Sequence, residues 1–590
     1  MSVLSKSSVP VNSNDFEAII DQWLDCESDV DIDNSDILIE SEHDTNSEIS
    51  DSDTNSEDGD SEDTTDGKVS KFYYGKNRYK WSQKSFYSRN TRTLQHNIVV
   101  NLPGLRNSYH NNSDITPLQA WSYFVDDEIL FEILTWTNIE ISKHREKYQI
   151  YSSDLRDVDI IELRAFIGLL FYSAMFKSNH EDISSIFATD GSGRDIFRCV
   201  TSKNRFSILL ACLRFDNPDD REARNINDPA AAISGIFNRF VINWQTVYTM
   251  GTCVCVDEML GGFRGRCKFK MYLPLKPVKY GLKIMCLVDA KTNYFYNGYI
   301  YVGKDYDGNT LDENDRKFSK PTQSVLRLTK PVNKTNRNIT ADNWFTSIEL
   351  IEELKKRGNT YVGTVRKNKR EIPPEFLPKK NRQVGSSLFG FTKDITLVSF
   401  TPKSNKCVIL ASSMHHDSSI ENTGKPEIIE FYNSTIGGVD SLDKKCAIYC
   451  TGRRTRRWPM AIFLRVLDIS GVNAYIVHKT NENFNDIARI NFMKKLAHSL
   501  VVPEMERRLQ NKRINKEIKS NIRRVLNTRK DLSSTPLHDH LLNPRKTCYL
   551  CPPKKKKRKT SHPCYLCGQP ICLECSKKGC KECIGISEEI

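Results

Sequence analysis

Apolar residues recur at intervals of three and four between residues 115 and 251, which is the repeat of an amphipathic helix. Residues 126–144, DDEILFEILTWTNIEISKH, show the pattern most clearly, and their first turn carries the acids that a helix dipole favours there. Residues 159–176 and 205–215 repeat the pattern. We therefore predict a helical domain over residues 115–251.

After residue 251 the repeat changes to the alternation and short apolar runs of β-strands. The strands predicted in this part of the chain are 252–260, 280–290, 294–303, 337–342, 360–366, 395–400 and 407–413. Inside the third of them, Asn297-Gly298 has the composition of a tight hairpin turn, so two short runs are expected on either side of it.

Helices are predicted between some of these strands. Residues 344–358 have a single apolar face, and Thr346 or Ser347 can cap the helix. A second helix is predicted over 437–449. Strands mixed with helices predict an α/β domain over residues 252–449.

A second helical region is predicted over residues 450–530. Its first part, 459–500, is apolar, whereas 504–530 contains ten Lys and Arg residues. We predict a linker over 531–545 and a small cysteine-rich domain over 546–590.

Charge is distributed unevenly along the 590 residues, which have 86 Lys and Arg against 74 Asp and Glu and a net charge of +12. Residues 1–66 contain 21 acids and one lysine, so they carry −20 and leave +32 on the rest. Too few apolar residues lie there to offset chain entropy, and we predict an acidic disordered tail over 1–70, then a linker region over 71–114. A body this basic favours nucleic acid as a partner.

The acidic tail has more than one interpretation. It is typical of a solubilising segment, but its charge would also let it mimic DNA and compete for the basic body. Ser50, Ser52 and Ser56 are candidate phosphate acceptors within it.

The sequence gives no indication of a membrane or secreted protein. The longest apolar stretch, 163–176, carries Arg164 and is far shorter than the roughly 20 residues that a membrane span needs. The first residues, MSVLSKSS, lack the apolar core of a secretion signal. We expect an intracellular protein with no membrane partner, in which clustered cysteines are metal ligands and not disulfides.

Four aspartates stand where carboxylates can meet at one point. Asp257 and Asp342 each close an apolar strand, and Asp440 and Asp443 lie three residues apart, which places both on one face of a helix. Carboxylates that meet in this way repel one another unless they hold divalent cations, and oxygen ligands suit Mg²⁺ or Mn²⁺. Two such ions roughly 4 Å apart support phosphodiester chemistry. Taken singly, each aspartate is also typical of an ordinary cap or turn.

Five segments are similar, in amino-acid sequence and in their order along the chain, to motifs of the piggyBac family of DDE transposases. They are VDEMLGGFRGRCKFKMYLPLKPVKYGLKIM (256–285), TADNWFTS (340–347), GTVRKNKREIP (363–373), FYNSTIGGVDSLD (431–443) and RRWPM (456–460). The resemblance covers roughly residues 115–590. It implies an RNase H-like catalytic domain over 252–449 with a β-rich insertion at about 368–428. It also implies that the helical segments on either side form a dimerisation and DNA-binding domain.

The resemblance implies roles for the four aspartates. Asp257, Asp342 and Asp440 are the expected catalytic triad, which holds two Mg²⁺ or Mn²⁺ ions, and Asp443 is a fourth essential acid. The implied reaction is cut-and-paste transposition at TTAA sites: a nick frees a 3′-hydroxyl, this attacks the opposite strand to leave a hairpin, and the reopened ends are joined to a new TTAA. The implied partners are double-stranded DNA, as terminal repeats and target, and further copies of the chain in a homodimer or larger assembly.

Basic residues lie close to these motifs. A first cluster follows Asp257 and could hold phosphates beside the scissile bond: Arg264, Arg266, Lys268, Lys276, Lys279 and Tyr280. By resemblance, Arg366, Lys369 and Arg370 are contacts to target DNA. A third cluster consists of Arg453, Arg454, Arg456 and Arg457, followed by Trp458-Pro459. An exposed Trp458 would stack on an unpaired or flipped base. The alternative is that Trp458 anchors the core and the arginines form a solvated face.

The C-terminal segment contains four CxxC pairs within 36 residues. They are Cys548 and Cys551, Cys564 and Cys567, Cys572 and Cys575, and Cys580 and Cys583. Eight thiolates satisfy two tetrahedral Zn²⁺ ions, and four-cysteine sites of this kind are structural. A cross-braced arrangement is favoured, in which pairs one and three share one ion and pairs two and four the other, and sequential pairing is the alternative. By resemblance, this segment binds the transposon end, and His562 is not needed as a ligand.

Six consecutive basic residues, Lys554, Lys555, Lys556, Lys557, Arg558 and Lys559, lie between the first two pairs. Such a run after a proline is typical of a nuclear import signal, so we expect a nuclear import receptor as a partner and the nucleus as the location. A phosphate-binding loop on the zinc module is the alternative, and the two are compatible.

Two other functions fit parts of the sequence. A domesticated transposase would keep the zinc segment and the basic surfaces as a DNA-binding protein without turnover, but such a protein has no need for all four aspartates. A ubiquitin ligase would explain a cross-braced cysteine segment similar to a RING, but it leaves about 500 preceding residues without a role.

Overall fold

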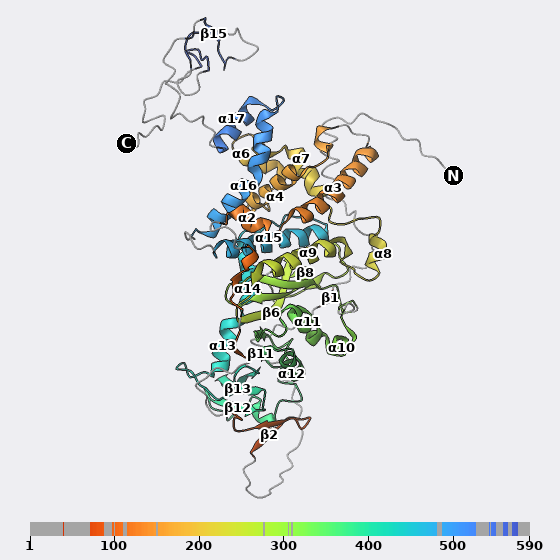
Figure 1. The fold of residues 1–590 in the computed structure, drawn as a ribbon, viewed down its shortest axis with the longest axis vertical. Helices are drawn as coiled ribbons and strands as arrows, with labels where there is room; N and C mark the ends of the chain where they lie inside the picture. The colour runs from red at the N-terminus through yellow and green to blue at the C-terminus, as the bar shows by residue number, and fades with distance from the viewer. Residues whose placement is uncertain are drawn as a thin grey trace, which may run out of the picture. The chain divides into compact units, whose positions relative to one another are not determined.

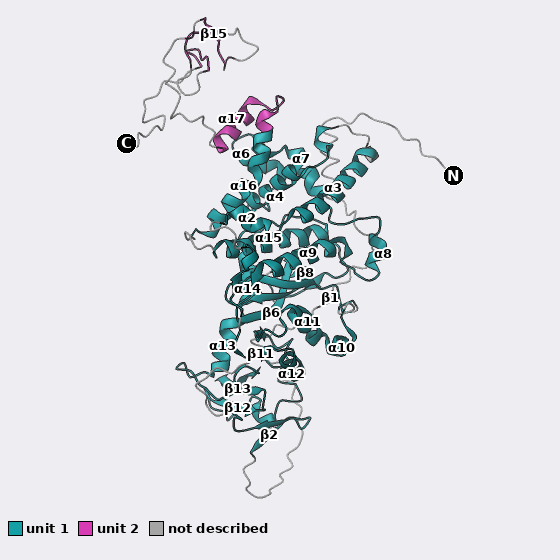
Figure 2. Ribbon diagram, viewed as in Figure 1, with its two compact units in different colours: residues 1–507 teal, residues 508–590 magenta. Residues whose placement is uncertain are grey.

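The structure is a computed structural model of the chain. It describes residues 39–40, 71–87, 97–99, 101–109, 115–148, 152–274, 276, 278–304, 306–307, 311–480, 487–526, 542, 544–549, 551, 558–563 and 569–575. The chain divides into two compact units, Met1–Arg507 and Arg508–Ile590 (Figure 2).

The region predicted to be helical before residue 252 forms helices. They are α2 (Pro117–Ser122), α3 (Asp127–Tyr148), η3 (Ser153–Leu155), α4 (Ile160–Met175), α5 (Ile183–Ile186), α6 (Asp195–Val200), α7 (Lys203–Cys212), α8 (Arg221–Asn225) and α9 (Ala231–Val247). Local sequence explains where they begin. Thr116 and Gln119 form a reciprocal capping box on α2, and the Asp159 carboxylate accepts the Glu162 N–H at the start of α4.

Most strands of the first unit join one sheet of twelve strands (Figure 1). Its central members are β6 (Cys253–Gly262), β7 (Met271–Tyr272), β8 (Tyr280–Asp289), β9 (Phe295–Ile300), β10 (Asn338–Ala341) and β11 (Thr360–Thr364). β8 runs antiparallel to β6 and to β9, whereas β10 lies parallel to β6 and to β11. The order β9–β8–β6–β10–β11 therefore combines three antiparallel strands with two parallel ones.

Helices cover the two sides of this central sheet. They are α10 (Glu313–Arg316), α11 (Lys320–Thr329), η4 (Lys330–Val332), α12 (Ile348–Lys356), α13 (Glu427–Thr435) and α14 (Gly438–Ile448). α14 packs on β6 and β8, and α13 packs on β6, β11 and β14 (Lys406–Ser412). α11 contacts β8 and β9, and α12 contacts β11, on the other side of the strands in Figure 1. Ser347, not Thr346, caps α12, because its hydroxyl accepts the Leu350 N–H.

The prediction of a hairpin turn at Asn297-Gly298 is wrong. Both residues lie inside β9, and the chain turns earlier, between β8 and β9, around Asn293 at φ 62°. Close packing, and not a turn, requires a glycine at position 298. A Cβ there would lie 2.4 Å from the Phe295 ring and 2.7 Å from the Met285 carbonyl oxygen. The Asn297 side-chain amide donates to the Leu328 carbonyl, which ties β9 to α11.

Beyond β11 the sheet continues through β14 (Lys406–Ser412), β13 (Thr396–Lys403) and β12 (Ser387–Phe391), with η5 (Pro374–Phe376) before them. These strands carry the predicted β pair. β14 pairs with β11, so they extend the central sheet and do not form a separate one.

Strands also form in two segments where none was predicted. In the predicted linker region, β2 (Phe72–Tyr74) and β3 (Lys80–Ser82) form a hairpin that pairs with β12, and β4 (Gly104–Leu105) pairs with β5 (Tyr248–Thr249), followed by η2 (Asn107–Tyr109). In the tail predicted to be disordered, β1 (Ile39–Glu40) pairs in parallel with β7. The apolar run ILI at 37–39 is a local exception to the acidic composition that led to the prediction.

The second helical region contains α15 (Trp458–His478), α16 (Arg489–Gln510) and α17 (Lys516–Val525). Pro459 occupies the first turn of α15, where its missing N–H has no partner within the helix to lose. Among the described residues, α15 is the one helix that is long and apolar enough to cross a membrane, and 83% of its apolar window is buried inside the protein. It is thus a core helix, packed on α2, α9 and α14.

Candidate functional site

Asp257 and Asp342 lie side by side on neighbouring strands. β10 is parallel to β6 with Ala341 opposite Val256, and each aspartate is the next residue in its chain. Asp342 follows the end of β10, as predicted. Asp257 does not close its strand, because β8 pairs with β6 along its whole length and carries it on to Gly262.

Asp440 reaches the same place from the first turn of α14. This helix approaches the sheet closely at Gly438, where a Cβ would lie 3.0 Å from the Cβ of Cys255 on β6. The Cys255 thiol donates to the Ile436 carbonyl at 2.8 Å and holds the chain just before the helix. A small residue and one hydrogen bond therefore fix how far Asp440 stands from the strands.

The three carboxylates interact electrostatically. The pKa of Asp257 is raised well above its ordinary value, chiefly by burial and then by the negative charges of Glu258, Asp342 and Asp440. Lys276 opposes this effect: its ammonium lies 3.6 Å from the Asp440 carboxylate, and the surrounding acids raise its own pKa. Three carboxylates that meet in this way form a donor set that suits hard divalent cations, so Asp257, Asp342 and Asp440 fit Mg²⁺ or Mn²⁺.

Asp443 has a different surrounding. Its carboxylate lies 3.3 Å from the guanidinium of Arg465 on α15, and Arg465 is almost fully buried. The negative charge of Asp443 still acts on Lys276. Asp443 therefore joins α14 to α15 and supports the helix that carries Asp440.

The backbone and side chain of Asp342 are held by local hydrogen bonds. The Trp344 N–H donates to the Asp342 carboxylate at 3.0 Å, and the Thr346 hydroxyl donates to the Asp342 carbonyl at 2.7 Å. The same hydroxyl lies 2.7 Å from the buried Tyr361 hydroxyl on β11. These contacts hold the Asp342 carboxylate beside Asp257, which is the residue opposite it on the neighbouring strand.

Sequence reasoning missed a buried charge pair beneath the site. Glu258 follows Asp257 on β6, so its side chain lies on the opposite face of the sheet, and its carboxylate is 4.0 Å from the Lys283 ammonium. Both side chains are almost fully buried, and the Lys283 ammonium also lies 5.2 Å from the Trp344 ring. The available signal was a pair of charges inside two otherwise apolar strands.

The basic cluster after Asp257 remains largely exposed. Arg264, Arg266, Lys268 and Lys279 are exposed, whereas Tyr280 is half-buried and packs on Tyr272 with ring centroids 4.8 Å apart. At the end of β11, the Arg366 guanidinium donates to the Asn343 side chain at 3.4 Å, beside Asp342. Lys369 is half-buried and Arg370 is exposed.

The structure corrects the expectation for three members of the third cluster. Trp458 is 5% exposed and packs edge-on against Phe269, so it is a core anchor and cannot stack on a base. Arg453 is buried and donates to the carbonyls of Ser178 and Glu181. Arg457 is also buried, and its guanidinium donates to the carbonyls of Ala211 and Leu213. These arginines satisfy backbone groups between helices, whereas Arg454 and Arg456 are exposed.

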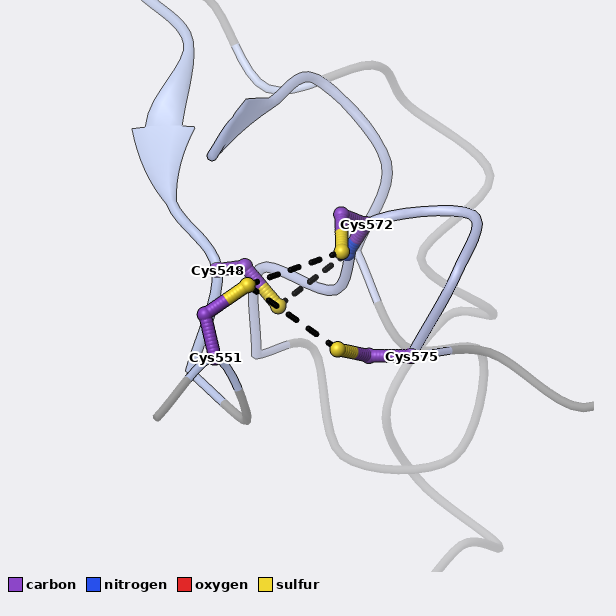
Figure 3. Close-up of side chains that lie close together, drawn as sticks. All are labelled: Cys548, Cys551, Cys572 and Cys575. Atoms are coloured by element: carbon purple, nitrogen blue, oxygen red, sulfur yellow. Dashed lines mark hydrogen bonds between the residues drawn. The ribbon is translucent and has the colours of Figure 1, made fainter. Parts of the chain in front are cut away.

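The second unit brings four cysteine sulfurs together between β15 (Lys546–Thr547) and the segment after β16 (Lys559–Thr560) (Figure 3). Cys548, Cys551, Cys572 and Cys575 have their sulfurs within 4.8 Å of one another. The Cys551 sulfur is 3.8 Å from that of Cys572 and 3.9 Å from that of Cys575. Four sulfurs bound at about 2.3 Å to one tetrahedral Zn²⁺ would be about 3.8 Å apart, so the cluster fits this ion.

Pairs one and three thus lie together, as the cross-braced arrangement requires and sequential pairing does not. The other four predicted ligands, Cys564, Cys567, Cys580 and Cys583, lie outside the described residues, as do Lys554, Lys555, Lys556 and Lys557 of the basic run. Arg558 is exposed and forms an ion pair with Glu574, and Lys559 is exposed in β16.

Comparison with known proteins agrees with this geometry. A solved structure, the cryo-EM structure of the piggyBac transposase synaptic complex with hairpin DNA, matches 82% of this chain and 100% of its own, with a TM-score of 0.71 and 36% identity. A family model described as Transposase IS4 matches residues 116–475, more than half of the chain. The chain belongs to the piggyBac family of transposases.

Human members of the family are more distant. PiggyBac transposable element-derived protein 3 of Homo sapiens is 23% identical over 391 residues, and piggyBac transposable element-derived protein 2 is 21% identical over 394. Each match covers 62% of this chain, and 61% and 62% of the respective relative. The chain therefore spans about three-fifths of the length of these human relatives. The residues matched by the family model, 116–475, include the strands and the helix that carry Asp257, Asp342 and Asp440.

Proposed function

We propose that this piggyBac-family chain is a metal-dependent DNA transposase that moves an element by cut and paste at TTAA sites. The observation that carries the proposal is the meeting of Asp257, Asp342 and Asp440 from β6, β10 and α14, with a raised pKa at Asp257. The strand order β9–β8–β6–β10–β11 supports an RNase H-like catalytic domain, in which carboxylates meet at the centre of the sheet.

The three aspartates would hold two Mg²⁺ or Mn²⁺ ions, which supply activation of the attacking oxygen and stabilisation of the leaving oxygen. The protein's own contribution is position. β6 and β10 set two carboxylates at one level, and the contact of Gly438 with β6 sets the third. Lys276 compensates part of the negative charge and would contact a phosphate beside the scissile bond. Asp443 and Arg465 hold α14 in place.

The reaction that this arrangement supports begins with a nick that frees a 3′-hydroxyl at the element's end. That hydroxyl attacks the opposite strand and leaves a hairpin, which is reopened before the ends are joined to a new TTAA. Arg264, Arg266, Lys268 and Lys279 follow β6 and are exposed, and they would contact phosphates of the bound DNA.

The remaining parts of the proposal concern partners. The printed title of the matching structure describes a synaptic complex with hairpin DNA, which supports DNA binding and a multimer of at least two chains here. Two structural Zn²⁺ ions would fold the C-terminal segment, which would bind the transposon end. The basic run from Lys554 to Lys559 would bind a nuclear import receptor and direct the protein to the nucleus.

The test is strand cleavage of a labelled duplex that joins the element's own end to a TTAA flank. We expect nicking and a hairpin product with Mg²⁺, and neither with EDTA or in Asp257→Ala. Asp312→Ala is the matched control, because Asp312 is a largely exposed carboxylate in an ion pair with Lys330 outside the site. DNA binding by Asp257→Ala should be preserved or strengthened, since a negative charge near phosphate has been removed.

A second function is favoured by the names of the human relatives, which are described as transposable element-derived proteins. On that reading the chain is a domesticated DNA-binding protein without turnover. Tight DNA binding with no cleavage under either Mg²⁺ or Mn²⁺ would establish this alternative and reject the transposase. Equal cleavage by Asp257→Ala and by the unmodified protein would reject the assignment of the site.

A further inference from the structure

The hairpin formed by β2 and β3 is basic and carries no acid. Residues 67–113 contain nine Lys and Arg and neither Asp nor Glu, in a chain whose preceding 66 residues carry −20. Five of these cations are exposed on or beside the hairpin: Lys71, Lys76, Arg78, Lys80 and Lys84. Among the described residues, none of the five forms an ion pair with a carboxylate, and the Lys80 ammonium lies 3.8 Å from the centre of the Phe72 ring.

The hairpin is mounted rigidly on the loop that follows β11. Trp81 is fully buried, and its indole N–H donates to the Glu371 carbonyl at 2.9 Å. The Asn77 N–H donates to the Arg370 carbonyl at 3.3 Å. A Cβ at Gly75 would lie 2.7 Å from the Arg370 carbonyl oxygen, so the two backbones touch. Three separate contacts therefore fix the hairpin against Arg370 and Glu371.

Two acids beside the hairpin accept hydrogen bonds from its polar side chains. The Asn77 side-chain amide donates to the Glu371 carboxylate at 3.5 Å, and the Tyr79 hydroxyl donates to the Glu352 carboxylate at 3.1 Å. Arg78 takes the left-handed conformation, at φ 64°, and so forms the turn that presents the cations at 76 and 78. Tyr74, which is 49% exposed, adds a hydroxyl donor of the kind that contacts phosphates.

We propose that the β2–β3 hairpin binds the phosphate backbone of duplex DNA, next to the surface formed by Arg366, Lys369 and Arg370. The hairpin is the far end of the twelve-stranded sheet in Figure 1, so it would extend the basic surface from the end of β11 across the insertion strands. That the duplex is target DNA rests on the proposed function. A rigid mount matters because cations held in place lose less conformational entropy on contact with phosphates.

The recognition is independent of base sequence. Lysine and arginine on a short hairpin tip reach phosphates without entering a groove, so the contacts add affinity and salt dependence but no base preference. The acidic residues 1–66 precede the hairpin in the chain and would compete with DNA for the same cations.

The experiment compares the full chain with the variant Lys76→Gln/Arg78→Gln. Binding to a plain 30-base-pair duplex that contains TTAA but no element end is followed by fluorescence anisotropy over a range of NaCl concentrations. A plot of log K against log salt has a negative slope, and each lost phosphate contact makes it less steep by about 0.9. The double variant should therefore have a slope that is less negative by about 1.8. The control, Lys317→Gln/Lys330→Gln, removes the same charge from two exposed lysines near α10 and α11, and its slope should not change.

A second measurement separates this proposal from the proposed function. Nicking of an intact element end should be unchanged in the hairpin variant, whereas joining of pre-cleaved ends to target DNA should fall at limiting target. Absence of nicking in the unmodified protein would refute the transposase and leave the salt slope as the test of the hairpin. A slope that is unchanged in the hairpin variant, or changed equally in the control, would overturn the hairpin's role.

Discussion

Two adjacent glycines at the start of α14 offer a sharp test of how the third carboxylate is positioned. A Cβ at Gly438 would lie 3.0 Å from the Cys255 Cβ and 3.4 Å from the Ala290 Cα, whereas carbon atoms in ordinary contact are about 3.5–4.0 Å apart. In Gly438→Ala, α14 must therefore move outward by a few tenths of an ångström, and Asp440 moves with it. Because a misplacement of about 1 Å can cost about a hundredfold in rate, we expect cleavage to slow by roughly threefold to tenfold.

Gly437→Ala is the matched control. Its Cβ would meet nothing nearer than the Ser441 hydroxyl at 4.0 Å, so cleavage should remain within about twofold of the unmodified protein. The assay is single-turnover nicking with saturating Mg²⁺, with urea unfolding run in parallel. Overpacking at Gly438 should cost about 1–3 kcal/mol of the free energy of unfolding and leave the protein folded. Equal nicking rates in the two variants would refute the reasoning that the contact with β6 sets the position of Asp440.

Three further predictions concern stability and metal binding. Because the Trp458 ring is buried, Trp458→Ala should lower the free energy of unfolding by about 3–5 kcal/mol in urea titrations. The salt dependence of DNA binding should stay unchanged. Weaker DNA binding without a loss of stability would instead support stacking of Trp458 on a base. Burial raises the pKa of Asp468 in the folded protein to about 6, above its value in the unfolded chain. Between about pH 4 and pH 6 the folded state therefore binds a proton that the unfolded state has released. The free energy of unfolding should fall by on the order of 3 kcal/mol as the pH rises through this range. Asp468→Asn, which can still accept from Thr451, should flatten that part of the stability profile. Mass spectrometry should find two zinc ions per chain, and one in each of the variants Cys551→Ser and Cys564→Ser. A loss of both ions in either variant would contradict the prediction of two independent zinc sites.

The aspartates of the site could be predicted from the sequence because each is tied to an element with a clear pattern. Asp342 follows a short apolar strand, and Asp440 lies in the first turn of a helix that begins at Gly438. Their meeting could not be derived from spacing, because it depends on the parallel register of β6 and β10, which links residues more than eighty positions apart. The sequences of the motifs indicated that these aspartates act together, because they resemble the motifs of the piggyBac family.

Predictions failed where one composition fits two environments. Asn297-Gly298 has the composition of a turn, but a glycine is also needed where a ring and a neighbouring backbone leave no room for a Cβ. Arg453 and Arg457 are charged, yet each is buried where several backbone carbonyls need donors, and no periodicity reports that. The hairpin at β2 and β3 was missed because its strands are three residues long and are stabilised by the pairing of Ser82 with Phe391 of β12, 309 positions later.

The hairpin also has a consequence for solubility. A sheet edge with unpaired N–H and carbonyl groups is a template for association with other chains, and short strands flanked by lysine protect against it. β12 has the sequence SLFGF, with Phe389 and Phe391 in contact, and β3 pairs with its end. A shortened protein that begins at residue 88 would leave this apolar strand as the edge. Such a protein should self-associate in proportion to its concentration, so residues 71–87 serve as a built-in guard against aggregation.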